Sequence, residues 1–459
     1  ATMDPVDETK QNKLLTAEEK RRQLKAKKIG ASYRIKRAAL DAYDPPENPW
    51  VLTGPGTAGI QPNELQPTLA DHWVRCSILL DGICRANGIR YFHFRQPNQY
   101  VSDREMSAAE RAFGLLDEDF DAEGAPVVPG FIDAHVHLTG GGGEDGFSTQ
   151  APPVPLSQFT VFGATSVVGL LGTDDETRNT ANLVARVRAL REEGLSAWCW
   201  TGGYHVPPTT LTGTVRSDIV NIDCVIGLGE LAISDHRSSQ PTLDELARLA
   251  SEVHVAGLLA RKAGVMHLHL GDGERGLEMV RRLLKETELP PRVFHPTHLN
   301  RRKALFEEAC EISRRGVTID ATAFPVEEGE DAWSAADAWS LFHEQGGDPL
   351  RFTISSDGGG CLPVFNEQGE LKKMDFATSK GLVDTLQELM RHGHSLAEIL
   401  PSMTSNVAGL MRLPGKGRIS AGLDADLSIL DSNGGVSHVM ANGRWMVQDG
   451  APVVKGTFE

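Results

Sequence analysis

Short apolar stretches alternate with segments of helical spacing through the middle of this chain, and this alternation limits the fold more than any other feature. Stretches with the composition of buried strands begin near Val127, Thr165, Ala197, Cys224, Val265, Val293, Val317 and Arg351. Helical spacing of apolar residues is found at Leu243–Arg261, and a second helix is expected at Lys303–Arg315. Eight strand–helix units predict an α/β fold with a TIM-type (β/α)8 barrel.

The segments outside this repeat indicate a smaller β unit and an arm. Residues 46–126 are rich in Pro and Gly with apolar runs at 76–80 and 91–94, and the tail has strand-like runs at 425–431, 437–440 and 444–447. We therefore expect a barrel at 127–411, flanked by β segments at 46–126 and 412–459. Residues 1–45 are charged and predict a helical arm that lies across the body or a neighbouring subunit.

The charge balance limits the partners. The net charge is -16 and the isoelectric point is near 5.4, whereas binding to a nucleic-acid backbone needs a basic face. No apolar run reaches the ~20 residues of a membrane span, and six cysteines are scattered without the spacing of a disulfide framework. We expect a soluble, cytoplasmic protein with reduced thiols, which binds neither nucleic acid nor membrane and forms a homo-oligomer.

The stretch Pro129–Leu138, followed by the glycine run 140–143, carries the first chemical signal. Side chains two apart on a strand point the same way, so His135 and His137 are expected to face one pocket. Two converging imidazoles suit a metal ion such as zinc. The alternative is a pair of buried core histidines, but the flanking Pro-Gly-Phe-Ile-Asp and the glycine run favour the metal.

Further ligand-type residues lie at the ends of other predicted strands: Glu230, His269, His298 and Asp357. Because the chemistry of such a barrel gathers at the carboxyl ends of its strands, we expect these side chains to converge with the two histidines. His267 precedes His269 by two residues, and we interpret it as a support of the site or a core histidine rather than a ligand.

Several motifs together resemble one family. The stretch 129–138 resembles the strand-one signature of the amidohydrolase superfamily, and with Gly140 to Glu144 it is similar to the metal-dependent isoaspartyl dipeptidases. Further matching motifs are 170–174, 201–207, 232–238, 296–301, 355–358 and 454–459. The resemblance covers about residue 127 to residue 459. It implies that both chain ends build one β-sandwich beside the barrel, although only the tail half matches the family pattern.

The resemblance also implies the reaction. It assigns His135, His137 and Asp357 to one metal ion, and His269 and His298 to a second, with a carboxylate between them. Two divalent ions, zinc above all, would share a hydroxide that attacks the isopeptide bond of β-aspartyl dipeptides. Asp357 would take the proton and pass it to the leaving amine.

One departure from the family lies at Glu230, where the isoaspartyl dipeptidases have a carboxylated lysine. The preceding segment 225–229 is one residue longer than the family pattern, and this residue is expected to bulge the strand inward. Our hypothesis is that Glu230 bridges both metals without bicarbonate. The contrary reading is that Glu230 faces the rim of the core and only one metal binds.

A β-aspartyl dipeptide presents one ammonium and two carboxylates. On the resemblance, Glu144 pairs with the ammonium, Arg237 and Arg301 hold carboxylates, and Tyr204 donates to the developing oxyanion. Thr173 adds a hydrogen bond. Cys361 takes the place of a substrate-binding serine, which makes the preferred dipeptide harder to predict because a thiol is a weaker donor.

Two other functions remain open from the sequence. One is a related amidohydrolase acting on another amide, such as an N-acyl amino acid or a cyclic imide. The other is a non-catalytic scaffold with the same fold, whose N-terminal arm binds partners. Glu144 distinguishes the first, since an acylated substrate has no ammonium, and retention of every ligand type disfavours the second.

Overall fold

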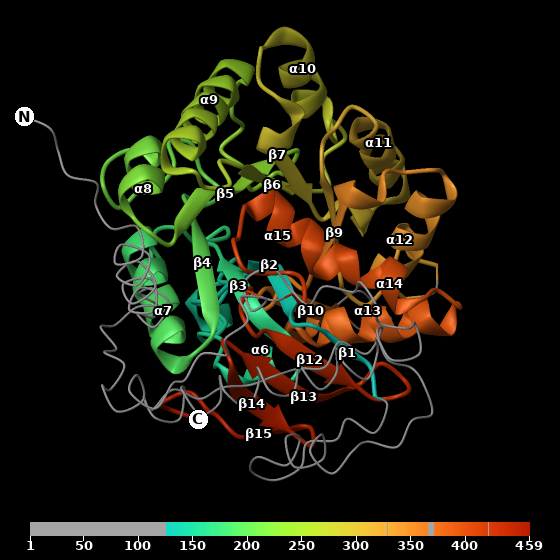
Figure 1. The fold of residues 1–459 in the computed structure, drawn as a ribbon. Coiled ribbons are helices and arrows are strands. Elements are labelled where there is room, and N and C mark those ends of the chain that lie inside the picture. The colour runs from blue at the N-terminus through green and yellow to red at the C-terminus, as the bar shows by residue number, and fades with distance from the viewer. Residues whose placement is uncertain (1–124, 328, 366–370, 421) are drawn as a thin grey trace, which may run out of the picture. The chain divides into compact units, whose positions relative to one another are not determined.

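The computed structural model describes residues 125–459 except 328, 366–370 and 421, and Figure 1 draws the others as a grey trace. The described residues belong to one of the two units into which the chain divides, Ala122–Glu459. The predicted arm at 1–45 and the predicted strands at 76–80 and 91–94 lie outside the described residues.

Parallel strands form the centre of this unit. Six pair in the order β2-β3-β4-β5-β6-β7, and β8 pairs with β9. Their bounds are β2 (Phe131–Val136), β3 (Ala164–Gly169), β4 (Ser196–Thr201), β5 (Val225–Ile233), β6 (Met266–Leu270), β7 (Phe294–Thr297), β8 (Ile319–Thr322) and β9 (Phe352–Ser355). β7 lies beside β8, and a parallel bridge between Val136 and Gly358 joins the end of β9 to β2.

Helices surround these strands, as Figure 1 shows, so the predicted TIM-type α/β fold is confirmed. They are α6 (Ser157–Thr160), α7 (Thr180–Glu193), α8 (Val215–Asn221), α9 (Leu243–Ala260), α10 (Glu278–Glu286), α11 (Lys303–Ser313), α12 (Ala335–Glu344), α13 (Lys380–Arg391), α14 (Leu396–Ile399) and α15 (Ser405–Met411). α9 and α11 confirm the two predicted helices. α9 starts with a capping box, in which the Thr242 hydroxyl accepts from the Glu245 N–H and the Glu245 carboxylate accepts from the Thr242 N–H.

The barrel strands are covered on both faces. Every residue of β2 and of β5 is buried, which is the usual condition of a parallel sheet between helices and a packed interior. Polar side chains in these strands therefore have to find partners inside the barrel. This requirement shapes the site described below.

A five-stranded sheet beside the barrel joins the two ends of the described chain (Figure 1). Its order is β1 (Val127–Pro129), β12 (Leu427–Leu430), β13 (Val436–Ala441), β14 (Arg444–Gln448) and β15 (Ala451–Pro452). The strands predicted at 425–431, 437–440 and 444–447 are confirmed by β12, β13 and β14. A hairpin that was not predicted, β10 (Cys361–Phe365) with β11 (Leu371–Phe376), follows β9.

The first predicted strand needs correction. Val127–Pro129 pairs antiparallel with Leu427–Ile429 in the outer sheet, and the barrel strand begins only at Phe131. Gly130 separates the two, and a Cβ there would lie 2.3 Å from the Thr165 side chain. Two apolar strands divided by a single glycine read as one strand in the sequence.

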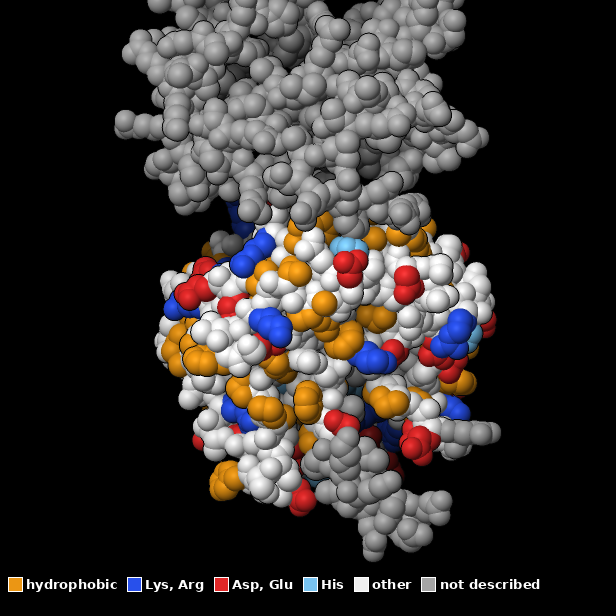
Figure 2. Space-filling view, turned by 90° about the horizontal axis from the view of Figure 1, so that it is seen from below, with side chains coloured by type: hydrophobic (Ala, Val, Ile, Leu, Met, Phe, Trp, Pro, Cys, Tyr) orange, Lys and Arg blue, Asp and Glu red, His pale blue; other side chains and the backbone are white. Residues whose placement is uncertain are grey.

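The surface and the helices add two observations. On the face in Figure 2, the coloured acidic, basic and apolar side chains are interspersed, and the described residues form no continuous basic area there. None of the helices in the described part of the chain has the combined length and apolarity to cross a membrane.

Candidate metal centre

The six predicted ligands come from the carboxyl ends of five barrel strands. His135 is in β2 and His137 follows it, Glu230 is in β5, His269 is in β6, His298 follows β7, and Asp357 follows β9. The structure brings all six together. In each of three overlapping sets drawn from them, the ligand atoms lie within 4.8 Å of one another.

The first group surrounds one oxygen of Asp357. His137 Nε2 lies 3.0 Å and His135 Nε2 3.3 Å from Asp357 Oδ1. Glu230 Oε2 lies 3.6 Å from His135 Nε2 and 4.0 Å from His137 Nε2. Three of these atoms, His135 Nε2, Glu230 Oε2 and Asp357 Oδ1, are buried without a hydrogen-bond partner among the described residues. Buried polar atoms without partners are costly, and a cation between them would satisfy all three.

The second group surrounds the other oxygen of Glu230. Glu230 Oε1 lies 2.6 Å from His269 Nδ1 and 2.9 Å from His298 Nε2. Glu230 therefore directs one carboxylate oxygen to each group. His298 has a left-handed backbone, with φ of 60°, and its Nδ1 lies 2.8 Å from the Thr322 hydroxyl, which holds the ring with Nε2 inward.

Burial and charge act in opposite directions on this cluster. Burial lowers the pKa of His135, but the carboxylates of Glu230 and Asp357 overcome this and raise it to about 9. Burial favours a neutral Glu230, yet the neighbouring His135 and His269 hold the pKa of Glu230 well below its usual range. Burial lowers the pKa of His298 to about 3 and keeps that ring neutral, whereas the two carboxylates favour positive charge beside His135. A divalent cation supplies it and leaves the imidazoles neutral, as ligation requires, so these residues fit a metal centre.

An irregularity in β5 positions Glu230. Leu228 pairs with Met266 and Leu231 with Leu268, so β5 has one more residue than β6 in this interval. The extra residue falls at Gly229 and Glu230, and the peptide bond between them is cis. The bulge expected from the longer segment is therefore present, and the Glu230 side chain lies at the centre of the cluster, 0% exposed. The contrary expectation, that Glu230 faces only the rim of the core, does not fit this geometry.

Asp133, which is not among the site residues predicted from the sequence, positions Asp357. Asp133 is buried in β2 and accepts hydrogen bonds from the Ser356 N–H (3.1 Å), the Ser356 hydroxyl and the Ser379 hydroxyl (2.9 Å). Asp357 itself has a left-handed φ of 55°, so the chain on both sides of it must be fixed for its carboxylate to point inward. The signal was an acidic residue within a buried strand, two positions before His135.

Replacing Asp133 by asparagine is expected to lower the free energy of unfolding by ~1–3 kcal/mol, because the amide cannot accept from all three donors and leaves a buried group unsatisfied. Denaturant-induced unfolding measures this. Asp449→Asn is the control, since the Asp449 side chain is 94% exposed. An equal loss in both variants, or none in Asp133→Asn, would contradict the role assigned to Asp133.

The residues predicted to bind substrate lie around the same cluster. The Tyr204 hydroxyl is 2.8 Å from His269 Nδ1. Arg237 contacts Glu144 at 3.1 Å, and the Thr173 hydroxyl donates to the same Glu144 oxygen at 3.0 Å. Glu144 and Arg237, predicted to hold opposite charges of a ligand, thus pair with each other in this structure.

Asp235 is a second residue of the site that is not among those predicted from the sequence. It accepts two bonds from the Arg237 guanidinium, at 3.0 and 2.8 Å, and its Oδ2 lies 3.0 Å from His269 Nε2. Asp235 therefore orients an imidazole of the cluster and an arginine at its rim together. The feature of the sequence that could have identified Asp235 is its position in the segment Ser234–Arg237, directly after the barrel strand β5.

Arg301 and Cys361 complete the predicted set. Arg301 donates to the Leu270 carbonyl at 2.6 Å, and the same nitrogen lies 3.4 Å from His269 Nε2. Cys361 begins β10 and lies against the glycine run, where a Cβ built on Gly142 would be 3.5 Å from the Cys361 sulfur. The structure thus brings every predicted site residue to one end of the barrel.

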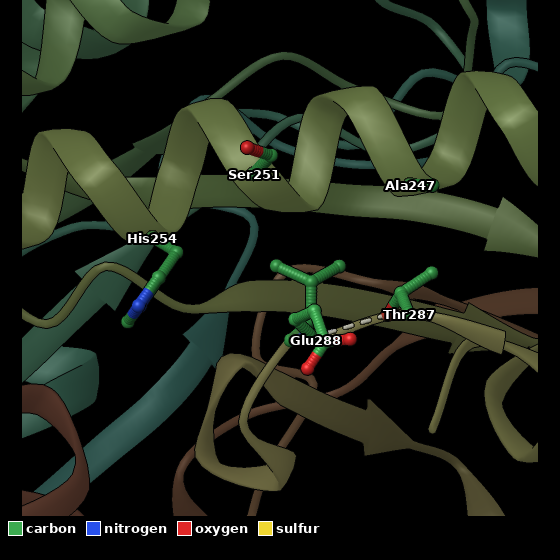
Figure 3. A pocket seen from close by; sticks show the side chains of 6 residues that line it. Ala247, Ser251, His254, Thr287 and Glu288 are labelled. Carbon is green, nitrogen blue, oxygen red and sulfur yellow. Dashed lines mark hydrogen bonds between the residues drawn. The ribbon is translucent and has the colours of Figure 1, made fainter. Parts of the chain in front are cut away.

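A separate pocket of about 320 Å³ lies on the outer helix layer (Figure 3). Ser251 and His254 on α9 face Thr287 and Glu288 across it. Its lining contains none of the six clustered residues and only one histidine and one carboxylate. It is the weaker candidate for a site of catalysis.

Comparison with known proteins points to one family. The family described as Amidohydrolase family matches residues 230–446. A structure of beta-aspartyl dipeptidase from Fervidobacterium islandicum AW-1 in complex with beta-Asp-Leu dipeptide is 41% identical, with a TM-score of 0.68 over 73% of this chain and 88% of that chain. A second structure from that organism is 39% identical, with a TM-score of 0.67 over 78% of this chain and 90% of that one. A Deacetylase of Brucella anthropi is 23% identical over 350 residues, which are 70% of this chain and 78% of that protein.

Proposed function

This chain belongs to the amidohydrolase family and is a relative of the beta-aspartyl dipeptidases within it, and on that premise we propose that it hydrolyses the isopeptide bond of β-aspartyl dipeptides at a centre of two zinc ions. His135, His137 and Asp357 would hold one ion, His269 and His298 would hold the other, and Glu230 would offer one carboxylate oxygen to each group. The observation that carries this proposal is the division of the Glu230 carboxylate, with Oε1 toward His269 and His298 and Oε2 toward His135 and His137.

The chemistry divides between the ions and the protein. Bound divalent ions activate water at neutral pH and polarise an amide carbonyl. Asp357 would accept a proton from the attacking water and deliver it to the leaving amine, and its partly exposed carboxylate, 22% accessible, supports this role. Burial and the nearby Glu230 raise the pKa of Tyr204 well above its usual range, so its hydroxyl stays protonated and donates to the developing oxyanion.

Recognition rests on charge. Glu144 receives the α-ammonium, and the Arg237 and Arg301 guanidinium groups receive carboxylates. Thr173 donates to Glu144 and fixes its position, while Cys361 borders the glycine run beside the ligand. Gly140, with φ of 84°, has backbone atoms of Ala151 where a Cβ would be, so only glycine allows this close course of the loop.

Metal analysis combined with a substrate screen tests the proposal. We expect two equivalents of zinc per chain, release of leucine from β-Asp-Leu, and loss of activity on chelation that zinc restores. One equivalent would support the single-metal alternative. Hydrolysis of N-acetyl amino acids without hydrolysis of β-Asp-Leu would replace the proposal with a deacylase function, which the similarity to a Deacetylase makes the relevant comparison. Bound zinc without turnover on any amide would indicate a scaffold.

Glu144→Gln is expected to lower kcat/KM for β-Asp-Leu by roughly 10–150-fold, the equivalent of the ~1.5–3 kcal/mol of a charge-assisted hydrogen bond. The loss should disappear when the substrate amine is acetylated, because no ammonium remains to pair. Steady-state kinetics on both substrates measure the difference. The neighbouring exposed Asp145 provides the control variant Asp145→Asn, which is expected to behave as wild type. An equal loss on both substrates would show that Glu144 acts through loop structure instead.

A further inference from the structure

A continuous chain of polar contacts crosses the barrel interior away from the metal centre. His135 Nδ1 lies 2.8 Å from His267 Nε2, and His267 Nδ1 lies 3.0 Å from His295 Nδ1. His295 Nε2 lies 3.0 Å from the Thr353 hydroxyl, which donates to Asp320 Oδ1 at 2.6 Å. The five side chains come from β2, β6, β7, β9 and β8, and each is at most 1% exposed. They connect a proposed metal ligand to a buried carboxylate.

Asp320, at the far end of this series of polar contacts, accepts several hydrogen bonds. Asp320 receives the hydroxyl groups of Thr297 at 2.7 Å and Ser355 at 2.6 Å in addition to Thr353. An ionised carboxylate only accepts hydrogen bonds, and at neutral pH the Asp320 carboxyl is ionised although burial raises its pKa to about 6. The series of polar contacts therefore ends on a negative charge enclosed in the barrel.

Binding of a metal ion by His135 Nε2 would fix which nitrogen of each histidine ring in this series donates and which accepts. Each contact between two ring nitrogens contains one proton, and both ring nitrogens of His267 and His295 are engaged in the chain. If His135 binds metal through Nε2, its proton must be on Nδ1, and His267 Nε2 accepts it. His267 must then donate from Nδ1 to His295, and His295 must donate from Nε2 to Thr353.

The opposite direction conflicts with ligation. Were Thr353 to donate to His295, every tautomer would reverse, and His267 would donate to His135 Nδ1. The neutral His135 ring would then carry its proton on Nε2, the atom that faces Glu230 and Asp357. Such a ring cannot bind a cation there.

We propose that Asp320 is a positioning residue for the metal centre: through Thr353, His295 and His267 it fixes the tautomer of His135 and strengthens His135 as a ligand. The inference rests on the metal centre of the proposed function but not on its substrate. A carboxylate bonded to the outer nitrogen of a metal-binding histidine has this effect directly. Here Thr353, His295 and His267 transmit this effect from Asp320 to His135. Trp200 stacks on His267 with an interplanar angle of 12° and restricts the orientation of that ring.

A purely structural role is the competing explanation, since Asp320 also joins β8 to β7 and β9 through its three hydroxyl donors. The variant Thr353→Val distinguishes the positioning role of Asp320 from a purely structural role. It removes the link between His295 and Asp320 at nearly constant volume and leaves the Thr297 and Ser355 bonds to Asp320. Thr165→Val is the matched control, because Thr165 is a buried barrel-strand residue whose hydroxyl has no hydrogen-bond partner among the described residues.

The test measures zinc affinity by chelator competition and histidine tautomers by ¹⁵N NMR on the full chain. We expect Thr353→Val to raise the zinc Kd about tenfold, at the lower end of the range for outer partners of metal ligands. The wild-type zinc-loaded protein should show His295 protonated on Nε2 and His267 on Nδ1, and Thr353→Val should lose this single pattern. Thr165→Val should match wild type in both.

Unchanged zinc affinity and unchanged tautomers in Thr353→Val would overturn the inference while leaving the proposed metal centre intact. Asp320→Asn provides a second variant with the same expected direction, and Thr353→Val decides alone if that variant does not fold. A wild-type protein that binds no zinc would overturn both the metal centre and this inference. Zinc binding without β-aspartyl dipeptidase activity would overturn only the proposed substrate.

Discussion

Glu230→Gln is expected to lower kcat/KM on β-Asp-Leu by on the order of 10³-fold, beyond the 10–100-fold caused by losing an outer partner of a metal ligand. Both carboxylate oxygens are engaged, Oε1 with His269 and His298 and Oε2 toward His135. An amide has one acceptor oxygen and directs N–H groups at the other set of ligands. Bound zinc should therefore fall below two equivalents, as measured by elemental analysis beside the kinetics.

The control for Glu230→Gln is another buried carboxylate. Asp218 is buried on α8, where it accepts from the Leu211 and Thr212 N–H groups, and none of the six clustered residues contacts it through a hydrogen bond. Asp218→Asn is expected to reduce stability but to keep both zinc ions. Full zinc content and full activity in Glu230→Gln would refute the bridge. Activity of the wild-type protein should also be independent of added bicarbonate, because Glu230 needs no carboxylation.

Asp357→Asn is expected to reduce kcat by about 10²–10⁴-fold, the usual contribution of general acid–base catalysis. The amide can neither accept the proton from water nor deliver it to the leaving amine. Its effect on binding should be smaller, because the carboxylates of the substrate are assigned to Arg237 and Arg301. Steady-state kinetics that separate kcat from KM measure this outcome, and zinc content shows how much of the loss reflects a missing ligand.

A buried aspartate directly before β12 of the outer sheet supplies the comparison for Asp357→Asn. Asp426 forms an ion pair with Lys416 at 2.7 Å, and Asp426→Asn should lower stability without changing kcat. If Asp357→Asn retained wild-type kcat, proton transfer would have to be assigned to another group. A rise in KM alone would make Asp357 a binding residue.

The fold and the convergence of the six proposed ligands could be predicted because they depend on patterns local in sequence. Apolar runs alternating with helices indicated the barrel strands, and α9 and α11 began at the expected residues. His135 and His137 are two residues apart at the end of β2, and the other proposed ligands follow apolar runs. Since parallel strands bring their carboxyl ends together, position along the chain predicted proximity in space.

Residues whose role depends on contacts across the barrel were harder to predict. Asp133 meets Ser356, 223 positions away in the sequence, and Asp235 meets His269, 34 positions away. Nothing in the neighbourhood of Asp320 in the sequence indicates that it ends a chain of contacts from His135. The limits of β1 also could not be read from hydropathy, because a single glycine separates it from β2.

The pairing of Arg237 with both Asp235 and Glu144 has a consequence for how a ligand enters. An arriving anion competes with two carboxylates for one guanidinium, and an arriving cation competes with that guanidinium for Glu144. A ligand that carries both an ammonium and a carboxylate at the right separation can replace both partners of the Glu144–Arg237 ion pair. A ligand with only one of these charges leaves Glu144 or Arg237 without the partner that the ligand displaced. If Glu144 and Arg237 bind the substrate as proposed, the mouth of the barrel selects zwitterionic ligands before any bond is broken.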